Sequence, residues 1–133
     1  MIAIKPTSKI LTLCTLSMAL AACGDANSPE PMQSLSFAES FQAQLIQAQP
    51  GDLIEVPPGT HEFTRSLSLT VPGVTIKGAG MDSSILSFKN QAQGAEGLLV
   101  SADDFVIQDL AIEDTVGDAL KINESTNVTI RRV

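Results

Sequence analysis

Three polar side chains recur at matching positions of a repeated pattern and could form one binding surface. Lys77, Gln108 and Arg131 each follow the isoleucine of an apolar-x-Ile triplet, with steps of 31 and then 23 residues between them. Lysine and arginine are the side chains that pair with carboxylates. Lys77 and Arg131 are therefore a candidate outward basic column. The simpler interpretation is a solvated face of mixed charge, with Asp109 and Arg132 forming a surface ion pair.

Carboxylates in turns offer a second kind of chemistry, the binding of Ca²⁺. Asp103–Asp104, Asp114 and Asp118 stand among turn residues. One repeat later, the positions that match Asp103–Asp104 are expected to be Ser125–Thr126, so no column of carboxylates forms. The pattern favours turn-forming aspartates. Ca²⁺ stays open as a cofactor, and the sequence predicts no metal ligand set.

His61 is the only histidine of the chain. No serine or cysteine nucleophile pattern accompanies it, so the sequence favours a polar residue at a strand edge. A catalytic base is the alternative.

The amino-terminal segment has the composition of an export signal. Lys5 and Lys9 precede an apolar stretch, residues 10–22, that is too short to span a bilayer. It ends in Leu20-Ala21-Ala22-Cys23, which resembles the lipobox of bacterial lipoproteins.

That resemblance implies cleavage between Ala22 and Cys23 and a lipid anchor on Cys23, so the protein would be attached to a membrane of the cell envelope. Gly24 favours the outer membrane, with the protein facing the periplasm or the cell surface. We therefore expect a signal peptide at 1–22, a polar, proline-containing tether at 23–35 and a folded part at 36–133.

The net charge limits the choice of partner. Without residues 1–22, which contain two lysines, the chain has 6 basic and 15 acidic residues, a balance of −9. Such a chain is not expected to bind nucleic acid by charge. The same charge counts against unaided binding of a polyanionic sugar chain.

Pairs of apolar residues two apart recur along the second half of the chain, with a step of 31 residues and then one of 22 or 23. Residues two apart on a strand face the same side, so the pairs should stack in a common interior as successive coils of parallel strands. The sequence predicts an all-β, right-handed parallel β-helix of about three coils. A loop opened by Gly78-Ala79-Gly80 and containing residues 85–88 is expected to be an insertion. The pairs are Leu67/Leu69, Leu98/Val100 and Leu120/Ile122, and Val74/Ile76, Phe105/Ile107 and Val128/Ile130.

An amphipathic helix is predicted just before the strands. Ser36 and Glu39 have the spacing of a capping box, and apolar residues follow at helical spacing until Pro50-Gly51. The expected helix runs over residues 37–49.

The segments 51–60, 74–80 and 127–131 resemble the coils of bacterial right-handed β-helix repeat proteins, the pectin-lyase-like superfamily. The resemblance covers about residues 37–133. It implies a helix that caps the amino-terminal end of the stack, as residues 37–49 would. It also implies polysaccharide handling, by binding or by lyase- or epimerase-type action on an acidic polysaccharide. Lys77 or Arg131 would then neutralise a uronate or abstract its C5 proton, with Ca²⁺ as a helper.

The chain departs from that family in length, because Val133 stands within a strand after about three coils. An uncovered coil has unpaired backbone groups and an open apolar end. We therefore expect the chain to be the amino-terminal part of a longer protein whose catalytic residues, unknown here, lie beyond residue 133.

Two other functions stay open: a non-catalytic periplasmic scaffold or partner-binding module, and an inactive remnant of a truncated gene. The chain has no tryptophan or tyrosine that could serve as an aromatic platform for sugars. Whether it is an enzyme is not decided by its sequence.

Overall fold

The computed structural model describes residues 36–133. The predicted signal peptide, its cleavage site at Ala22 and Cys23, and the tether lie outside the described residues. The described elements are α2 (Phe37–Gln47), β1 (Leu53–Val56), β2 (Gly59–Glu62), β3 (Arg65–Leu69), β4 (Thr75–Gly78), β5 (Ser84–Ser87), β6 (Gln93–Val100), β7 (Val106–Gln108), β8 (Ala111–Glu113), β9 (Leu120–Ile122) and β10 (Thr129–Arg131).

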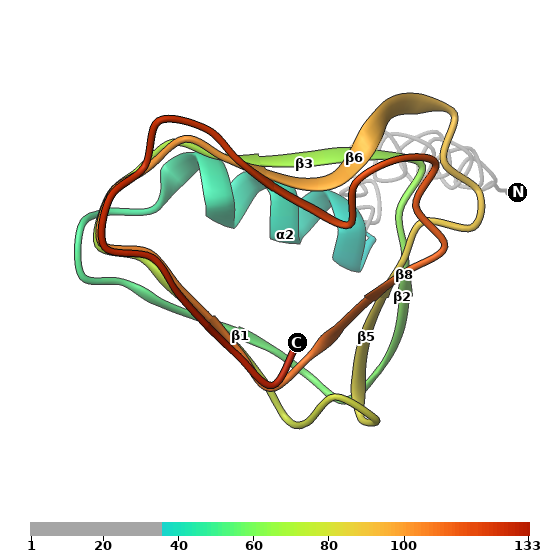
Figure 1. Cartoon of the computed structure of the whole chain (residues 1–133). Coiled ribbons are helices and arrows are strands. Elements are labelled where there is room, and N and C mark those ends of the chain that lie inside the picture. The colour runs from blue at the N-terminus through green and yellow to red at the C-terminus, as the bar shows by residue number, and fades with distance from the viewer. Residues whose placement is uncertain (1–35) are drawn as a thin grey trace, which may run out of the picture. The chain divides into compact units, whose positions relative to one another are not determined.

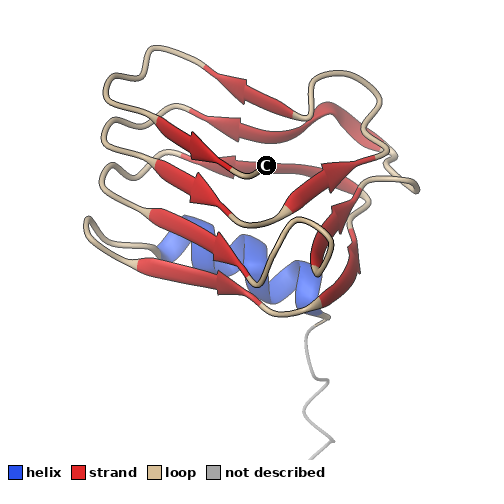
Figure 2. Cartoon of the chain, turned by 60° about the horizontal axis from the view of Figure 1, so that its bottom comes forward, coloured by secondary structure: helices blue, strands red, loops and turns tan. Residues whose placement is uncertain are grey.

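The strands form three parallel sheets that share one wound chain. Sheet A has the order β1-β4-β7-β10, sheet B the order β2-β5-β8 and sheet C the order β3-β6-β9. Each coil contributes one strand to each sheet, which gives three coils and the first strand of a fourth. Seen along the axis, the coils outline a triangle, and seen from the side they lie one above another (Figures 1 and 2). The winding is right-handed in both views. The predicted β-helix is thus confirmed.

The apolar pairs fill the interior as the sequence predicts. Leu67 aligns with Leu98 and then Leu120, and Ile76 aligns with Ile107 and then Ile130. The first two coils bury these side chains completely or nearly so, and Ile107 on β7 is also fully buried, whereas Leu120 on β9 is only half-buried and Ile130 on β10 is 51% exposed. Burial therefore declines from the helix end of the stack to the other end.

Helix α2 closes the end of the stack formed by the first coil. Its capping box is present: the Ser36 hydroxyl accepts a bond from the Glu39 amide, and the Glu39 carboxylate accepts one from the Ser36 amide. Phe41 and Leu45 are fully buried beneath it. The helix ends at Gln47, two residues earlier than predicted, and the next residue, Ala48, has the extended ψ of 153°.

Aromatic rings join the helix to the coils. Phe37 stacks on Phe41 with centroids 5.4 Å apart, and Phe63 of the first coil stacks on Phe88 of the second at 5.3 Å. Phe41 and Phe63 connect the two pairs at 6.0 Å. Burial of such large rings contributes a substantial part of the apolar stabilisation of a small domain.

The prediction that residues 85–88 belong to an insertion was wrong. Residues 84–87 form β5, the middle strand of sheet B, in register with β2 and β8. The second coil is longer because its connections, 79–83 and 88–92, and its last strand, β6, are longer than those of the first coil. The strand β5 is hard to recognise in the sequence because Ser84 is polar and yet fully buried. Its hydroxyl donates to the Val56 carbonyl at 2.8 Å and accepts from the Ala79 amide at 2.9 Å.

Candidate functional site on sheet A

The structure places the predicted basic column on the outer face of sheet A. Lys77, Gln108 and Arg131 are direct neighbours on β4, β7 and β10, and Glu55 on β1 precedes them in the same register. Lys77, Arg131 and Glu55 are exposed, and Gln108 is half-buried. Neighbouring strands are about 4.8 Å apart, so the polar side chains of the column follow one another at about that spacing. We call Lys77, Gln108 and Arg131 the basic column.

The predicted ion pair beside the column is confirmed. Arg132 Nη2 donates to Asp109 Oδ2 at 2.9 Å, and Arg132 Nε donates to Asp109 Oδ1. Both residues have positive φ, 61° and 51°, because they occupy equivalent positions of the corner between sheets A and B. The hydrogen bond from Arg132 lowers the pKa of Asp109, and Lys77 and Arg131 lower it further through their charge.

Within residues 36–133, the ion pairs are Arg132–Asp109 and Lys121–Glu96. Neither pair includes Lys77 or Arg131. The two cations of the basic column are therefore available to an anion from solution.

A hollow of about 740 Å³ lies at the edge of the column, which we call the corner groove. Its lining comes from equivalent places of three successive coils, so the groove crosses the strands and follows the axis of the stack. The lining residues are Glu55, Val56, Pro57, Pro58, Lys77, Gly78, Ala79 and Asp109. A hollow of this size is within the range that small-molecule sites occupy.

Gly78 shapes the corner groove. A Cβ atom built on it would lie 2.2 Å from the Asp109 carbonyl oxygen and 2.8 Å from the Cβ atoms of Leu110 and Ser84. Only glycine allows the second and third coils to approach this closely. The sequence analysis placed Gly78 at the opening of a loop and did not predict the groove. Nothing local in the sequence shows that Pro57-Pro58 lies beside Ala79 and Asp109.

The turn aspartates tie neighbouring coils together. Asp103 Oδ1 accepts from both the amide and the hydroxyl of Thr126 at 2.7 Å, and these bonds lower the pKa of Asp103. Asp104 Oδ1 accepts from Asn127 Nδ2 at 2.6 Å. The expected alignment of Asp103–Asp104 with Ser125–Thr126 was thus wrong by one residue. The extra residue is accommodated nearby, where Glu124 adopts a φ of 48°.

The other two turn acids are also placed in corners. Asp114 has a φ of 59° and accepts a bond from the Ser87 hydroxyl at 3.2 Å. The charge of Asp118 contributes to the raised pKa of Lys121, which is due first to its hydrogen bond with Glu96. In the described part of the chain, no three histidine, cysteine, aspartate or glutamate side chains are grouped so that they could hold a metal ion.

His61 lies on β2, the edge strand of sheet B, as the sequence favours. Its ring stacks on Phe37 with centroids 3.9 Å apart, and its Nε2 is 2.9 Å from the Pro57 carbonyl oxygen. The histidine connects the helix to the first coil and does not face the basic column.

A second hollow, of about 460 Å³, lies between α2 and the start of β3. Its polar lining includes Glu39, Gln42, Arg65 and Gln93, and sequence reasoning did not predict it. This hollow shares no lining residue with the corner groove.

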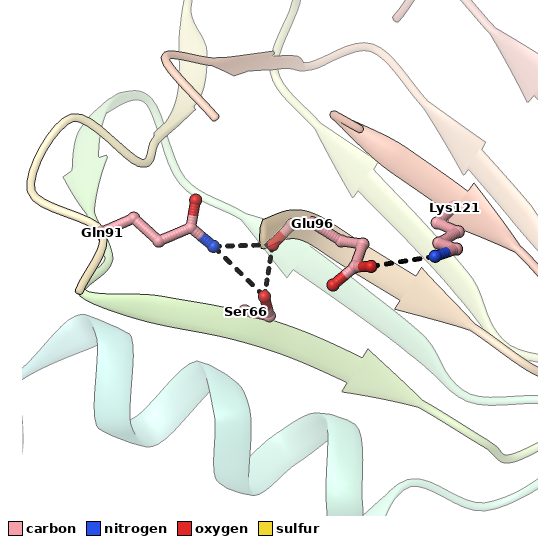
Figure 3. Close-up of polar contacts among 4 residues, drawn as sticks. All are labelled: Ser66, Gln91, Glu96 and Lys121. Atoms are coloured by element: carbon pink, nitrogen blue, oxygen red, sulfur yellow. Dashed lines mark hydrogen bonds and ion pairs between the residues drawn. The ribbon is translucent and has the colours of Figure 1, made fainter. Parts of the chain in front are cut away.

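Polar contacts outside sheet A hold the long connection before β6 (Figure 3). Gln91 Nε2 donates to the Glu96 carbonyl at 2.8 Å and to Ser66 Oγ at 3.1 Å, and Ser66 Oγ also donates to that carbonyl. The Glu96 carboxylate pairs with Lys121 at 3.0 Å. These contacts hold the connection against β3 and β9.

Comparison with protein-family models, with curated proteins and with solved structures found no match to this chain. Within residues 36–133, no helix has the length and apolar character needed to cross a membrane.

Proposed function

We propose that the protein is a lipid-anchored β-helix protein of the bacterial cell envelope that handles acidic polysaccharide on the outer face of sheet A. The observation that carries the proposal is the alignment of Lys77, Gln108 and Arg131 on neighbouring strands beside the corner groove. Two unpaired cations with an amide between them can hold carboxylates and hydroxyls of a sugar chain.

The charge of the whole chain does not decide this question, because binding depends on the local arrangement. Lys77 and Arg131 are the cations that face the column, and the nearby carboxylate of Asp109 is already paired with Arg132. Glu55 is the one acid in the same register. An acidic ligand therefore meets a locally positive surface over the second, third and fourth strands of sheet A.

The proposal is for binding by this chain. Lyase- or epimerase-type chemistry, with Ca²⁺ as a helper, is not part of the proposal for this chain. A matched pair of double variants tests it: Lys77→Met with Arg131→Met, and Arg65→Met with Lys89→Met as a control. Both remove two positive charges, but Arg65 and Lys89 lie outside the column.

The measurement is calorimetric titration of the full chain in detergent with uronate oligosaccharides and with neutral ones of the same length. We expect uronate binding to weaken about 25-fold in the column variant, as two surface pairs of up to about 5-fold each would give. The control variant should bind as the native chain does. Equal loss in both variants, or no uronate binding at all, would favour a scaffold or partner-binding module.

The lipid anchor has an independent test. Cys23→Ala removes the thiol that the lipid would modify. We expect the native chain to partition into the detergent phase of a bacterial envelope extract and the variant to stay in the aqueous phase. A native chain that stays in the aqueous phase would refute the anchor and would leave the proposed binding surface untouched.

A further inference from the structure

We propose that β1 is a docking edge for an extended peptide of another protein, which adds to sheet A as a further strand. The proposal is independent of sugar binding on the outer face of that sheet. Strand β1 (Leu53–Val56) is the edge of sheet A at the helix end of the stack. An edge strand can bind a peptide through main-chain hydrogen bonds, and alternate side chains then give the specificity.

The register shows which backbone groups of β1 are free to bind. Leu53 aligns with Thr75, and the Thr75 amide donates to the Asp52 carbonyl at 2.9 Å. In a parallel pair, alternate residues turn both their N–H and C=O groups toward the neighbouring strand. Asp52 and Ile54 therefore turn these groups toward β4, whereas Leu53 and Glu55 turn theirs away from it. Within residues 36–133, no turn, cap or side-chain hydrogen bond uses these four outward groups.

A hollow of about 240 Å³ lies beside this row of free groups, between the last turn of α2 and β1. The helix packs against β3 and β2, and Figure 1 shows it beside β3, with β1 on another side of the triangle. An added strand would therefore have β1 on one side and the exposed Gln44 and Gln47 on the other, whose amides can bond to its peptide groups. The lining residues are Gln44, Gln47, Ala48, Asp52, Leu53 and Ile54.

The exposed side chains of β1 select the peptide. Leu53 is 55% exposed, and an aliphatic residue beside it would cover it. Glu55 is exposed and forms no ion pair within residues 36–133, so a lysine or arginine of the peptide fits beside it. The residue between these two points toward the hollow, which is smaller than ordinary small-molecule sites and suits a small side chain. The peptide therefore has the order aliphatic–small–basic, counted in either chain direction.

Two other occupants fit this edge less well. A second copy would have to bring its own first coil to about 4.8 Å, but α2 covers that end of each stack and a helix with its side chains is about 10 Å across. The chain's own segment 24–35 contains Pro29 and Pro31, and proline lacks the N–H that a paired strand donates. A strand from another protein meets neither obstacle.

The test uses the full chain in detergent and an acetylated, amidated peptide with the core Lys-Ser-Val-Ser-Lys. With valine beside Leu53, this core places a lysine beside Glu55 in either direction. Binding is followed by the amide NMR signals of the chain, and we expect those of Leu53 and Glu55 to shift most. Glu55→Gln should weaken binding about 5-fold, as loss of one exposed ion pair does. Glu113→Gln removes the same charge from the outer face of sheet B and should leave binding unchanged.

The role of the backbone is tested with the uncharged core Ser-Ser-Val-Ser-Ser. Glu55→Pro removes an outward N–H but no bond to β4, and it should weaken binding more than 10-fold, whereas Glu55→Gln should bind this peptide as the native chain does. Thr60→Pro makes the same change on β2, the edge of sheet B, and should have no effect. Circular dichroism shows whether each proline variant is folded, and the charge test stands if one is not.

Three results would overturn the proposal. They are absence of binding by both peptides, signal shifts centred away from β1, and native affinity in a folded Glu55→Pro variant. Shifts that grow with chain concentration in the absence of peptide would place a second copy on the edge and would refute the proposal as well. None of these results bears on uronate binding by the basic column.

Discussion

Replacing single leucines of sheet C gives the most direct test of the coil arrangement. Leu98 is fully buried, with Leu67 on one side and Leu120 on the other. Leu98→Ala removes three buried carbon atoms and leaves a cavity between two coils, which costs about 3 kcal/mol. Leu120→Ala acts on a half-buried side chain and should cost about 1.5 kcal/mol. Leu99 faces outward between Ser68 and Lys121 and is also half-buried, but its replacement opens no interior cavity and should cost about 1 kcal/mol.

These differences are large relative to the stability of a domain of this size, which is of the order of 5–15 kcal/mol. For Leu98→Ala, the midpoint of thermal unfolding should fall by roughly 12–24 °C. Because the chain has no tryptophan or tyrosine, unfolding is best followed by far-ultraviolet circular dichroism in urea. The slope of the transition shows whether unfolding stays cooperative in each variant.

The order of the three costs is the critical result. If Leu99→Ala were as costly as Leu98→Ala, the assignment of inward and outward faces would be wrong. If Leu120→Ala were as costly as Leu98→Ala, β9 would be as well buried as β6, against the structure.

Three further predictions concern the corner, the helix and pH. Gly78→Ala should destabilise the fold by about 3 kcal/mol, because the new methyl group overlaps the Asp109 carbonyl. Urea unfolding measures the loss, and a variant as stable as the native chain would refute the close approach of the second and third coils. Ser36→Ala should cost about 1 kcal/mol by loss of the cap on the Glu39 amide, seen as a lower midpoint in the same assay; an unchanged midpoint would argue against the cap. Because Arg132 lowers the pKa of Asp109 below its ordinary 3.8, the pair adds stability above that value, which is lost as the pH falls through the lowered pKa. Arg132→Gln should therefore reduce the loss of stability on acidification, and an unchanged pH profile would contradict the coupling.

The interior of the stack could be predicted because strict alternation fixes which side chains face inward. Leu67, Leu98 and Leu120 share one column at the predicted spacing. The capping box could also be predicted, because Ser36 and Glu39 are only three residues apart in the sequence.

Sheet B could not be predicted in the same way, because its strands break the alternation. Its first inward position is His61, and Ser84 and Ser87 are buried polar residues that bond to the backbone of a turn or to an acid of the next coil. Polar residues at buried positions look like a loop in sequence. Their bonds form only after the coils stack.

The two parts of the candidate site also differ in whether the sequence predicts them. The basic column follows from the repeat and was predicted, since Lys77 and Arg131 occupy equivalent places of it. The corner groove depends on turns that are far apart in the chain and that differ in length from coil to coil. Those lengths carry no periodic signal, so the groove emerges only from the folded structure.

The decline in burial along the stack has a consequence for what a bound ligand does to the protein. Helix α2 and its aromatic rings protect the first two coils, whereas β10 carries the half-exposed Ile130. Local opening should therefore start at β10 and detach Arg131 while Lys77 keeps its place on β4. A sugar chain that spans both cations would fasten the least stable strand to the most stable part of the molecule, and would make the fold more rigid where it is weakest.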